Sequence, residues 1–267
     1  MKIDTKLSRF QTRCRGVKLD ILIPLQSKGA VNVNEINLKE LRTNLNRFML
    51  SYKFALEEVR TKINILREEF QVIHEYNPIE HISTRLKSPE SILKKMSKKD
   101  MKPSFDQMKE QIRDIAGVRI TCSFIEDIYK VSDLIQSQHD ITVVEVKDYI
   151  KTPKPNGYQS LHLIVQIPIF LTDRVEVVYV EIQIRTIAMD FWASLEHKIY
   201  YKYNKQIPSH IQDGLKEAAT QAALLDRKME QLNHEINILK KEDGEDSSLM
   251  TPNEVHQFLV QLSKEED

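Results

Sequence analysis

Residues 180–186 read VEIQIRT, an alternation of apolar and polar side chains along the whole run. Successive side chains of a β-strand point to opposite faces of the sheet. The apolar residues would therefore face a core, while Glu181, Gln183 and Arg185 would share the other face. We predict a strand whose polar face can hold charge in a cleft.

Two more segments that are expected to be strands carry a charged or titratable side chain between apolar neighbours. Arg119 lies in the segment 118–124, and His162 lies in the segment 160–170. Asp114 comes shortly before the first of these segments. If the three strands are neighbours, their polar faces form one concave surface with cations and carboxylates. Two carboxylates among basic groups suit magnesium and a polyphosphate.

Most of the remaining sequence is expected to be helical. Apolar residues recur three or four positions apart over residues 38–73 and again over residues 211–239, as in amphipathic helices. Further helices are expected after Ser88 and at residues 105–113, 127–138, 187–203 and 255–262, and strands at residues 79–87, 118–124, 141–150, 160–170 and 175–185. The expected fold class is α/β, in its α+β form. It has a mixed sheet of about five strands flanked by helices, with long N- and C-terminal helices.

Three regions are expected along the chain. Residues 1–37 form a basic N-terminal extension, residues 38–205 the main domain, and residues 206–267 a C-terminal helical region. Within the extension, residues 21–25 are either a short edge strand or a docking segment, and we expect a loosely attached chain. The two long apolar stripes either pack on the protein's own sheet or mediate a helix-based oligomer.

The composition narrows the class of protein. Of the 267 residues 41% are hydrophobic, which allows a sizeable core. Lys and Arg total 39, as do Asp and Glu, so the net charge of zero argues against a protein that coats nucleic acid or an anionic membrane. Cys14 and Cys122 fit no metal or redox spacing and are expected as free thiols in a reducing compartment. We expect no signal peptide and no membrane span, and hence a cytoplasmic location.

A basic segment lies ahead of the first polar strand. Arg85 and Lys87 lead into a helix whose first turns carry Ser91, Lys94 and Lys95. A helix N-terminus with a hydroxyl group and lysines suits an anion such as a phosphate. The guanidinium plane of an arginine can also stack on a nucleobase. The alternative is that these lysines are simply solvated surface.

Tyr158 lies in an exposed turn beside Gly157 and offers a second ring for stacking. Each of these residues also has a plainer interpretation. Tyr158 can be a packing residue, His162 a hydrogen-bonded core histidine, and Asp114 a brace for a turn at Gly117. Alternating charges on a strand can face solvent. The combination of three such strands favours a binding cleft.

Four segments together resemble the synthetase domain of RelA/SpoT homologues. They are residues 85–95, 114–119, 154–162 and 180–186, and the resemblance extends over about residues 45–205 in the same order. The chain is most similar to small alarmone synthetases of the RelQ type, for which residues 187–197 are typical. The resemblance implies a nucleotidyltransferase-like fold and makes residues 38–205 the synthetase domain.

The resemblance also implies the chemistry. Such enzymes transfer pyrophosphate from ATP to the 3′-hydroxyl of GDP or GTP, giving AMP and ppGpp or pppGpp in the stringent response to nutrient stress. Glu181 would be catalytic and would hold Mg²⁺ together with Asp114. The ATP-binding residues would be Arg85, Lys87, Ser91, Lys94, Lys95 and Arg119. The residues that bind GDP or GTP would be Lys154, Tyr158, His162, Gln183, Arg185 and Asp190.

Several further expectations come from the same resemblance. No paired histidine-aspartate motif of a hydrolase precedes the synthetase segment, so we expect synthesis without hydrolysis. A homotetramer is expected, with a central cleft that binds alarmone, for which Arg60 and Arg67 are candidate ligands. Single-stranded RNA is a further candidate partner. Residues 145–148, EVKD, mix two forms found among long family members, which leaves metal dependence and the choice between GDP and GTP open.

Two rival hypotheses stay open. The first is a catalytically weak module of the same fold that only binds nucleotides or RNA. The presence of both Asp114 and Glu181 argues against it. The second is a helical scaffold, which would explain the two apolar stripes but not the polar strand faces.

Overall fold

The computed structural model describes residues 7–14, 17–24, 38–73, 76–101, 104–202 and 207–242. Its elements follow one another along the chain as β1 (Leu7–Cys14), β2 (Val17–Pro24), α1 (Leu38–Ile73), β3 (Ile79–Leu86), α2 (Pro89–Lys98), α3 (Phe105–Gln111), β4 (Ala116–Cys122), α4 (Ile125–Gln136), β5 (Thr142–Asp148), β6 (Leu161–Phe170), β7 (Val175–Thr186), α5 (Ile187–Lys202) and α6 (Ser209–Glu242).

A five-stranded sheet forms the centre of the molecule, in the order β3-β4-β7-β6-β5. β4 and β7 run parallel, and the other neighbouring strands run antiparallel. This is the expected mixed sheet. β7, with the VEIQIRT run, lies in the middle of the sheet, so its apolar face is fully buried and its polar face is flanked on both sides.

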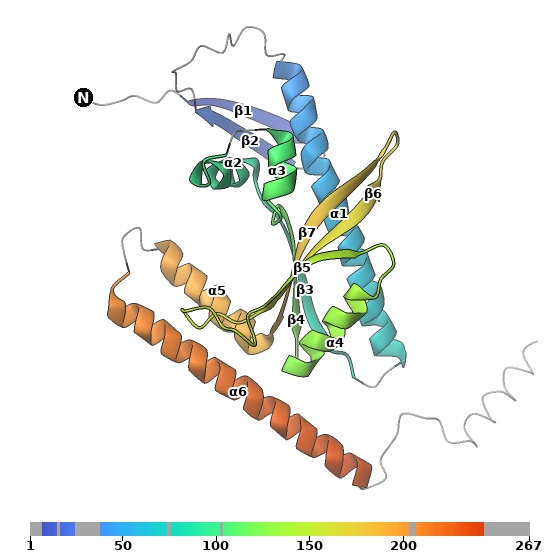
Figure 1. Cartoon of the computed structure of the whole chain (residues 1–267), viewed down its shortest axis with the longest axis vertical. Coiled ribbons are helices and arrows are strands. Elements are labelled where there is room, and N and C mark those ends of the chain that lie inside the picture. Colours follow the sequence, from blue (N-terminus) through green and yellow to red (C-terminus); the bar gives the residue numbers. More distant parts are fainter. Residues whose placement is uncertain are drawn as a thin grey trace, which may run out of the picture.

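The helix α1 covers one face of the sheet along its whole length (Figure 1). Its stripe of apolar residues is buried against the strands, and Tyr52, Ala55, Val59 and Ile63 are almost completely inaccessible to solvent. α4 covers the same face beside α1. The apolar stripe of α1 therefore packs on the protein's own sheet, which is the first of the two alternatives raised by its periodicity.

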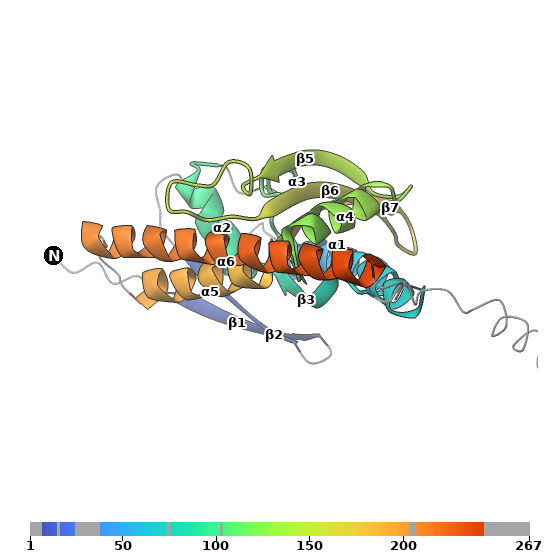
Figure 2. The same ribbon diagram turned by 90° about the horizontal axis from the view of Figure 1, so that it is seen from below.

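The opposite face of the sheet lies between two groups of helices. In Figure 1 α2 lies above this face with α3 between α2 and α1, where Phe105 packs against Phe48 of α1, and α5 and α6 lie below it. Figure 2 shows that α5 and α6 run side by side. The indole Nε1 of Trp192 on α5 donates a hydrogen bond of 2.9 Å to the carbonyl oxygen of Leu215 on α6, which joins the two helices.

The N-terminal region contains regular secondary structure, whereas the sequence predicted a loosely attached chain. β1 and β2 pair as an antiparallel hairpin, from Leu7 with Pro24 to Cys14 with Val17. Residues 21–24 of the apolar run thus belong to a strand, which was one of the two alternatives, and residue 25 lies outside the described part of the chain. The expected helix at residues 255–262 lies outside the described part of the chain. Among the helices that are described, none is both long and apolar enough to cross a bilayer.

β4 begins earlier than expected. It was predicted over residues 118–124 after a turn at Gly117, but the strand already includes Ala116 and Gly117. Gly117 pairs with Arg85 on one side and Glu181 on the other. The interpretation of Asp114 as a brace for a turn at Gly117 is therefore wrong, because Gly117 belongs to the ladder and makes no turn.

Candidate active site

The strand register places the polar residues in two parallel rows across the open face. One row runs Arg85, Gly117, Glu181, Ile164, Glu145 from β3 to β5, and the next runs Ser83, Arg119, Gln183, His162, Lys147. Residues paired directly across neighbouring strands point to the same face. Gly117 has no side chain, so the first row leaves open space between Arg85 and Glu181.

Asp114 lies at the entrance to β4, beside the basic helix α2. Its Oδ2 accepts hydrogen bonds from the Nζ of Lys87 at 2.6 Å and from the Nζ of Lys95 at 2.7 Å. Its Oδ1 is buried and has no hydrogen-bond partner among the described residues. One oxygen of this carboxylate thus holds two lysines, and the other is left to bind something else.

Asp114 is ionised despite its burial. Burial is the largest influence and favours the protonated form, but the hydrogen bonds and charges of Lys87 and Lys95 together hold the pKa of Asp114 below its ordinary value. The carboxylate is therefore present at neutral pH as a fixed negative charge between two cations.

Glu181 on β7 is oriented from both sides. The Nδ1 of His162 lies 3.3 Å from its Oε1, and the Nε2 of Gln183 donates to its Oε2 at 3.0 Å. Burial acts most strongly and raises the pKa of Glu181, whereas His162 and Gln183 lower it, and the net pKa lies below the ordinary value. The charge of Asp114, which lines the same cavity, acts in the opposite direction and raises the pKa of Glu181.

A chain of hydrogen bonds leads to Glu181. We assign a proton to the Nδ1 of His162, because this nitrogen faces a carboxylate. The other ring nitrogen, Nε2, forms a hydrogen bond of 2.8 Å with the hydroxyl of Tyr158. The same hydroxyl oxygen accepts a bond of 2.6 Å from Arg185. The chain ends at the contact between His162 and Glu181, which lowers the pKa of Glu181 and so favours its ionised form.

Arg185 is the most heavily bonded side chain of the site. It is buried and donates to Ser160, Gln183, Tyr158 and Asp190. Four of its five N–H groups are thereby used, because a guanidinium has five donors. Arg185 therefore orders the residues around it and has little capacity left for a ligand.

An aromatic cluster lies at the end of β5 and β6. The rings of Tyr149, Tyr158 and His162 meet edge to face, with centroids 5.2 to 6.1 Å apart. The Nζ of Lys154 lies 4.5 Å from the ring centroid of Tyr149 and 4.6 Å from that of Tyr158. Rings and cations in this arrangement can hold a flat, anionic ligand.

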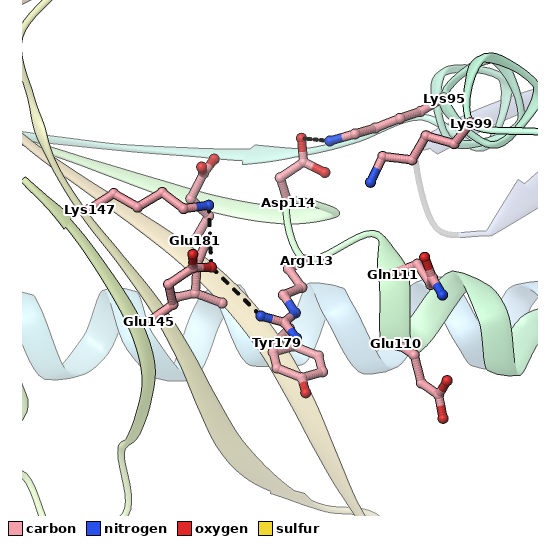
Figure 3. Close-up of a pocket in the computed structure, with 11 residues that line it drawn as sticks. Lys95, Lys99, Glu110, Gln111, Arg113, Asp114, Glu145, Lys147, Tyr179 and Glu181 are labelled. Carbon is pink, nitrogen blue, oxygen red and sulfur yellow. Dashed lines mark hydrogen bonds and ion pairs between the residues drawn. The ribbon is translucent and has the colours of Figure 1, made fainter. Parts of the chain in front are cut away.

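The two carboxylates line one cavity of about 760 Å³. In Figure 3 Asp114 and Glu181 project into it from the edge of β4 and from β7, and Lys95 and Lys99 approach from α2. On the far side Glu145 forms ion pairs with Arg113 at 3.6 Å and with Lys147 at 3.2 Å. The cavity thus combines two acidic groups with a rim of cations, as a polyphosphate with a divalent ion requires.

The site residues named from the sequence do not all lie in this cavity. Arg85 is exposed and lies diagonally opposite Arg119 on the neighbouring strand. Ser91 is hydrogen-bonded to Ser88 at the N-terminus of α2. Lys94 is exposed and does not line the cavity, whereas Lys99 does. Lys95 and Lys99 are four residues apart and share a helix face, while Lys94 is turned by about 100° from Lys95.

Several lining residues were not named as site residues from the sequence. They are Lys99, Glu110, Gln111, Arg113, Glu145, Lys147, Ile164 and Tyr179. For Tyr179 a signal existed, because it continues the alternation of VEIQIRT by one further step toward the start of β7. Arg113 lies 5.3 Å from the centroid of the Tyr179 ring, a contact between α3's end and β7 that the sequence does not reveal.

A pair of ionised carboxylates beside lysines and arginines, on the open face of a mixed sheet, defines a site of the phosphoryl-transfer class. The comparisons with known proteins are more specific. The region found in RelA/SpoT proteins matches residues 84–206. The GTP pyrophosphokinase YwaC of Bacillus subtilis is 54% identical over 201 residues, which are 75% of this chain and 96% of that protein. This chain therefore belongs to the RelA/SpoT family, in its small alarmone synthetase branch.

Other relatives agree with this assignment. The GTP pyrophosphokinase YjbM of Bacillus subtilis is 38% identical over 190 residues, 71% of this chain and 89% of that protein. The crystal structure of small alarmone synthetase 2 from Bacillus subtilis is 54% identical and superimposes with a TM-score of 0.66 over 72% of this chain and 99% of that one. The crystal structure of small alarmone synthetase 1 from Bacillus subtilis bound to its product pppGpp is 37% identical. It has a TM-score of 0.68 and covers 72% of this chain and 98% of that one. The fold expected from the sequence is thus confirmed.

Proposed function

We propose that this protein transfers the β,γ-pyrophosphate of ATP to the 3′-hydroxyl of GDP or GTP and releases AMP. The names of the relatives support the reaction. The observation that carries it is that Asp114 and Glu181, both ionised, line one cation-rimmed cavity. In the transfer, the 3′ oxygen forms a bond to the β-phosphorus, and the bond from that phosphorus to the oxygen bridging to the α-phosphate breaks.

The donor nucleotide would lie between β3, β4 and α2. Arg85 and Arg119 are diagonal neighbours on one face, so their guanidinium planes could enclose adenine. Lys87 and Lys95 form ion pairs with Asp114 in this structure, and their ammonium groups would also interact with the phosphates of ATP. Ser91 and Lys94 stay in the proposal as weaker candidates at the N-terminal end of α2.

The acceptor nucleotide would lie over the aromatic cluster. Tyr158 would stack on guanine, and Lys154 and His162 would lie near phosphate groups. Gln183 and Arg185 would support Glu181 and Tyr158 by the hydrogen bonds described above. The acceptor ribose would then approach Glu181 from the side of β6, opposite the donor.

Mg²⁺ is the cofactor we propose, and the residues fit it. Hard oxygen ligands are needed, and Asp114 offers a buried Oδ1 without a hydrogen-bond partner, with Glu181 in the same cavity. Bound there with the phosphates, Mg²⁺ would neutralise charge that develops on them during transfer.

Glu181 would act on the attacking hydroxyl. Its lowered pKa keeps the carboxylate ionised at neutral pH, so that it can orient the 3′-hydroxyl and accept its proton as the new bond forms. The donors His162 and Gln183 fix both of its oxygens. The residue is thus held in position before the substrates bind.

The test is synthesis from ATP, Mg²⁺ and labelled GDP or GTP in parallel. The wild-type protein should give a 3′-pyrophosphorylated product, and Glu181→Gln should lower kcat by about a hundredfold to ten-thousandfold. Glu176→Gln, on the same strand but on the face packed against α1, is the matched control and should retain activity. Tight nucleotide binding without product from the wild-type protein would reject catalysis and favour the binding module.

We also propose a homotetramer with an alarmone ligand in a central cleft, in which Arg60 and Arg67 are candidate ligands, and a cytoplasmic location. Single-stranded RNA is a further proposed partner. The proposal covers synthesis alone. Light scattering of the purified protein tests the assembly, and titration with pppGpp or a single-stranded oligonucleotide tests the ligands.

A further inference from the structure

Asp190 on α5 contacts two arginines with a single oxygen atom. Its Oδ1 lies 3.1 Å from an NH1 nitrogen of Arg119 on β4 and 3.1 Å from an NH1 nitrogen of Arg185 on β7. β4 and β7 are neighbouring parallel strands, so the two arginines project from adjacent positions of one face. Asp190 is the bridge that joins them.

The two guanidinium groups would repel one another without this bridge. Burial most strongly lowers the pKa of Arg119, and the charge of Arg185 lowers it further, whereas Asp190 raises it. The Nε of Arg119 is buried and has no hydrogen-bond partner among the described residues. Among the described residues, the ion pair with Asp190 is thus the polar contact that holds the guanidinium of Arg119.

The bridge connects the two substrate sides of the site. Arg119 belongs with Arg85 to the proposed clamp for adenine. Arg185 donates to the hydroxyl of Tyr158, which is the proposed platform for guanine. The path from the donor base to the acceptor base therefore runs through three ionic or hydrogen-bonded contacts and passes through one carboxylate oxygen.

We propose that Asp190 is a positioning residue that couples the donor and acceptor nucleotide sites, and that it is not itself a ligand of GDP or GTP. The inference rests on the proposed function, because it uses the proposed places of the two bases. Binding of ATP would fix Arg119, and Asp190 would transmit this order to Arg185 and Tyr158. By linkage, the acceptor strengthens ATP binding by the same factor.

The experiment measures this factor directly. The dissociation constant of a non-hydrolysable ATP analogue is determined by calorimetry with and without saturating GDP, in the presence of Mg²⁺. For the wild-type protein we expect GDP to tighten analogue binding about fivefold or more, as is common for coupled sites. Asp190→Asn keeps the shape but removes the charge, and the factor should fall to about one, because the charge-assisted bonds that join the arginines are lost.

Two controls separate coupling from other roles. Asp133→Asn makes the same change on an exposed position of α4, across the sheet, and should leave the coupling factor unchanged. Asp190→Glu keeps the charge and should retain part of the coupling. Circular dichroism and thermal unfolding identify any variant that fails to fold, and such a variant would be replaced by Asp190→Ser in the same titrations.

The results distinguish the two proposals. If Asp190→Asn keeps the full coupling factor and only weakens GDP binding, Asp190 is an acceptor ligand and the inference is overturned. If the wild-type protein binds the two nucleotides independently, it is overturned as well. Absence of a pyrophosphorylated product with coupling intact would instead reject the proposed reaction, since the titrations do not depend on turnover.

Discussion

Tyr158 combines two functions in one side chain. It packs against the apolar cluster that includes Trp192 and Ala219, and its ring is flanked by Lys154 and Arg185. Its hydroxyl joins Arg185 to His162 and hence to Glu181. The ring would serve the acceptor base, and the hydroxyl would serve the orientation of the catalytic carboxylate. Two substitutions can separate these contributions.

Tyr158→Phe retains the ring and removes the hydroxyl, so we expect kcat to fall about fivefold from the loss of one buried hydrogen-bond bridge while the KM for the acceptor changes little. Tyr158→Ala removes the ring as well, and the KM for the acceptor should rise about tenfold or more, as expected for a lost base stack. Steady-state kinetics with both substrates varied gives the two constants.

Tyr149→Phe, in the same cluster, is the control. An equal rise of the KM for the acceptor in both Tyr158 variants would contradict the separation of ring and hydroxyl.

The sequence predicted the direction of strand side chains well, because a period of two fixes it without any tertiary information. Glu181, Gln183 and Arg185 do share one face. The choice between Lys94 and Lys99 could not be made, since it depends on the rotation of α2 against the sheet. The sequence also could not predict that Arg185 uses most of its hydrogen-bond donors within the protein, because its partners come from separate elements.

At the scale of elements, the loop before β6 is held by both C-terminal helices. Gly157 has a φ of 87°, a left-handed conformation that favours glycine. A Cβ at this position would lie 2.5 Å from the Cβ of Ala219 on α6. Asn156 donates to Glu196 on α5 at 3.2 Å. The helices α5 and α6 thus hold the loop that carries Tyr158, although both lie outside the sheet.

Gly157→Ala should therefore displace the loop and raise the KM for the acceptor about tenfold, because it adds both a steric clash and a left-handed backbone penalty. The KM for ATP should change by less than about twofold, since the donor side lies across β7. Ala219→Gly removes the clash, so the double variant should recover part of the acceptor affinity, but not all of it because the φ strain remains. Steady-state kinetics of the two single variants and the double variant measures this, and purely additive effects would show that the contact with α6 is unimportant.

The bounds of α1 and α6 followed closely from apolar spacing, yet the same spacing did not say what each stripe contacts. A helical period defines a face and leaves its partner undefined. Similarly, Gly117 was expected in a turn because glycine favours turns. Its place in β4 depends on pairing with two strands distant in sequence, which local preference does not encode.

At the scale of the whole molecule, the two long helices behave differently. The stripe of α1 is buried on the sheet. In the first half of α6, Leu215 of the stripe is buried together with the neighbouring Ala219, whereas the later stripe members Leu225, Met229, Ile236 and Leu239 remain about half exposed. Figure 1 shows the last turns of α6 extending beyond the sheet and its covering helices. Residues 225, 229, 232, 236 and 239 alternate in steps of four and three, the spacing of a helix that packs on another helix.

We therefore expect the proposed homotetramer to use this half of α6. Ile236→Lys places a charge on the exposed stripe, and because a buried unpaired charge at an interface costs several kcal/mol, the mass measured by light scattering should fall to half that of the wild-type protein or less. Gln231→Lys adds the same charge to the opposite side of the helix and should leave the mass unchanged. Thermal unfolding at low protein concentration should show that both variants are folded, since Ile236 is already half exposed within one chain. An unchanged mass for Ile236→Lys would exclude this stripe as the interface and point to a different surface for assembly.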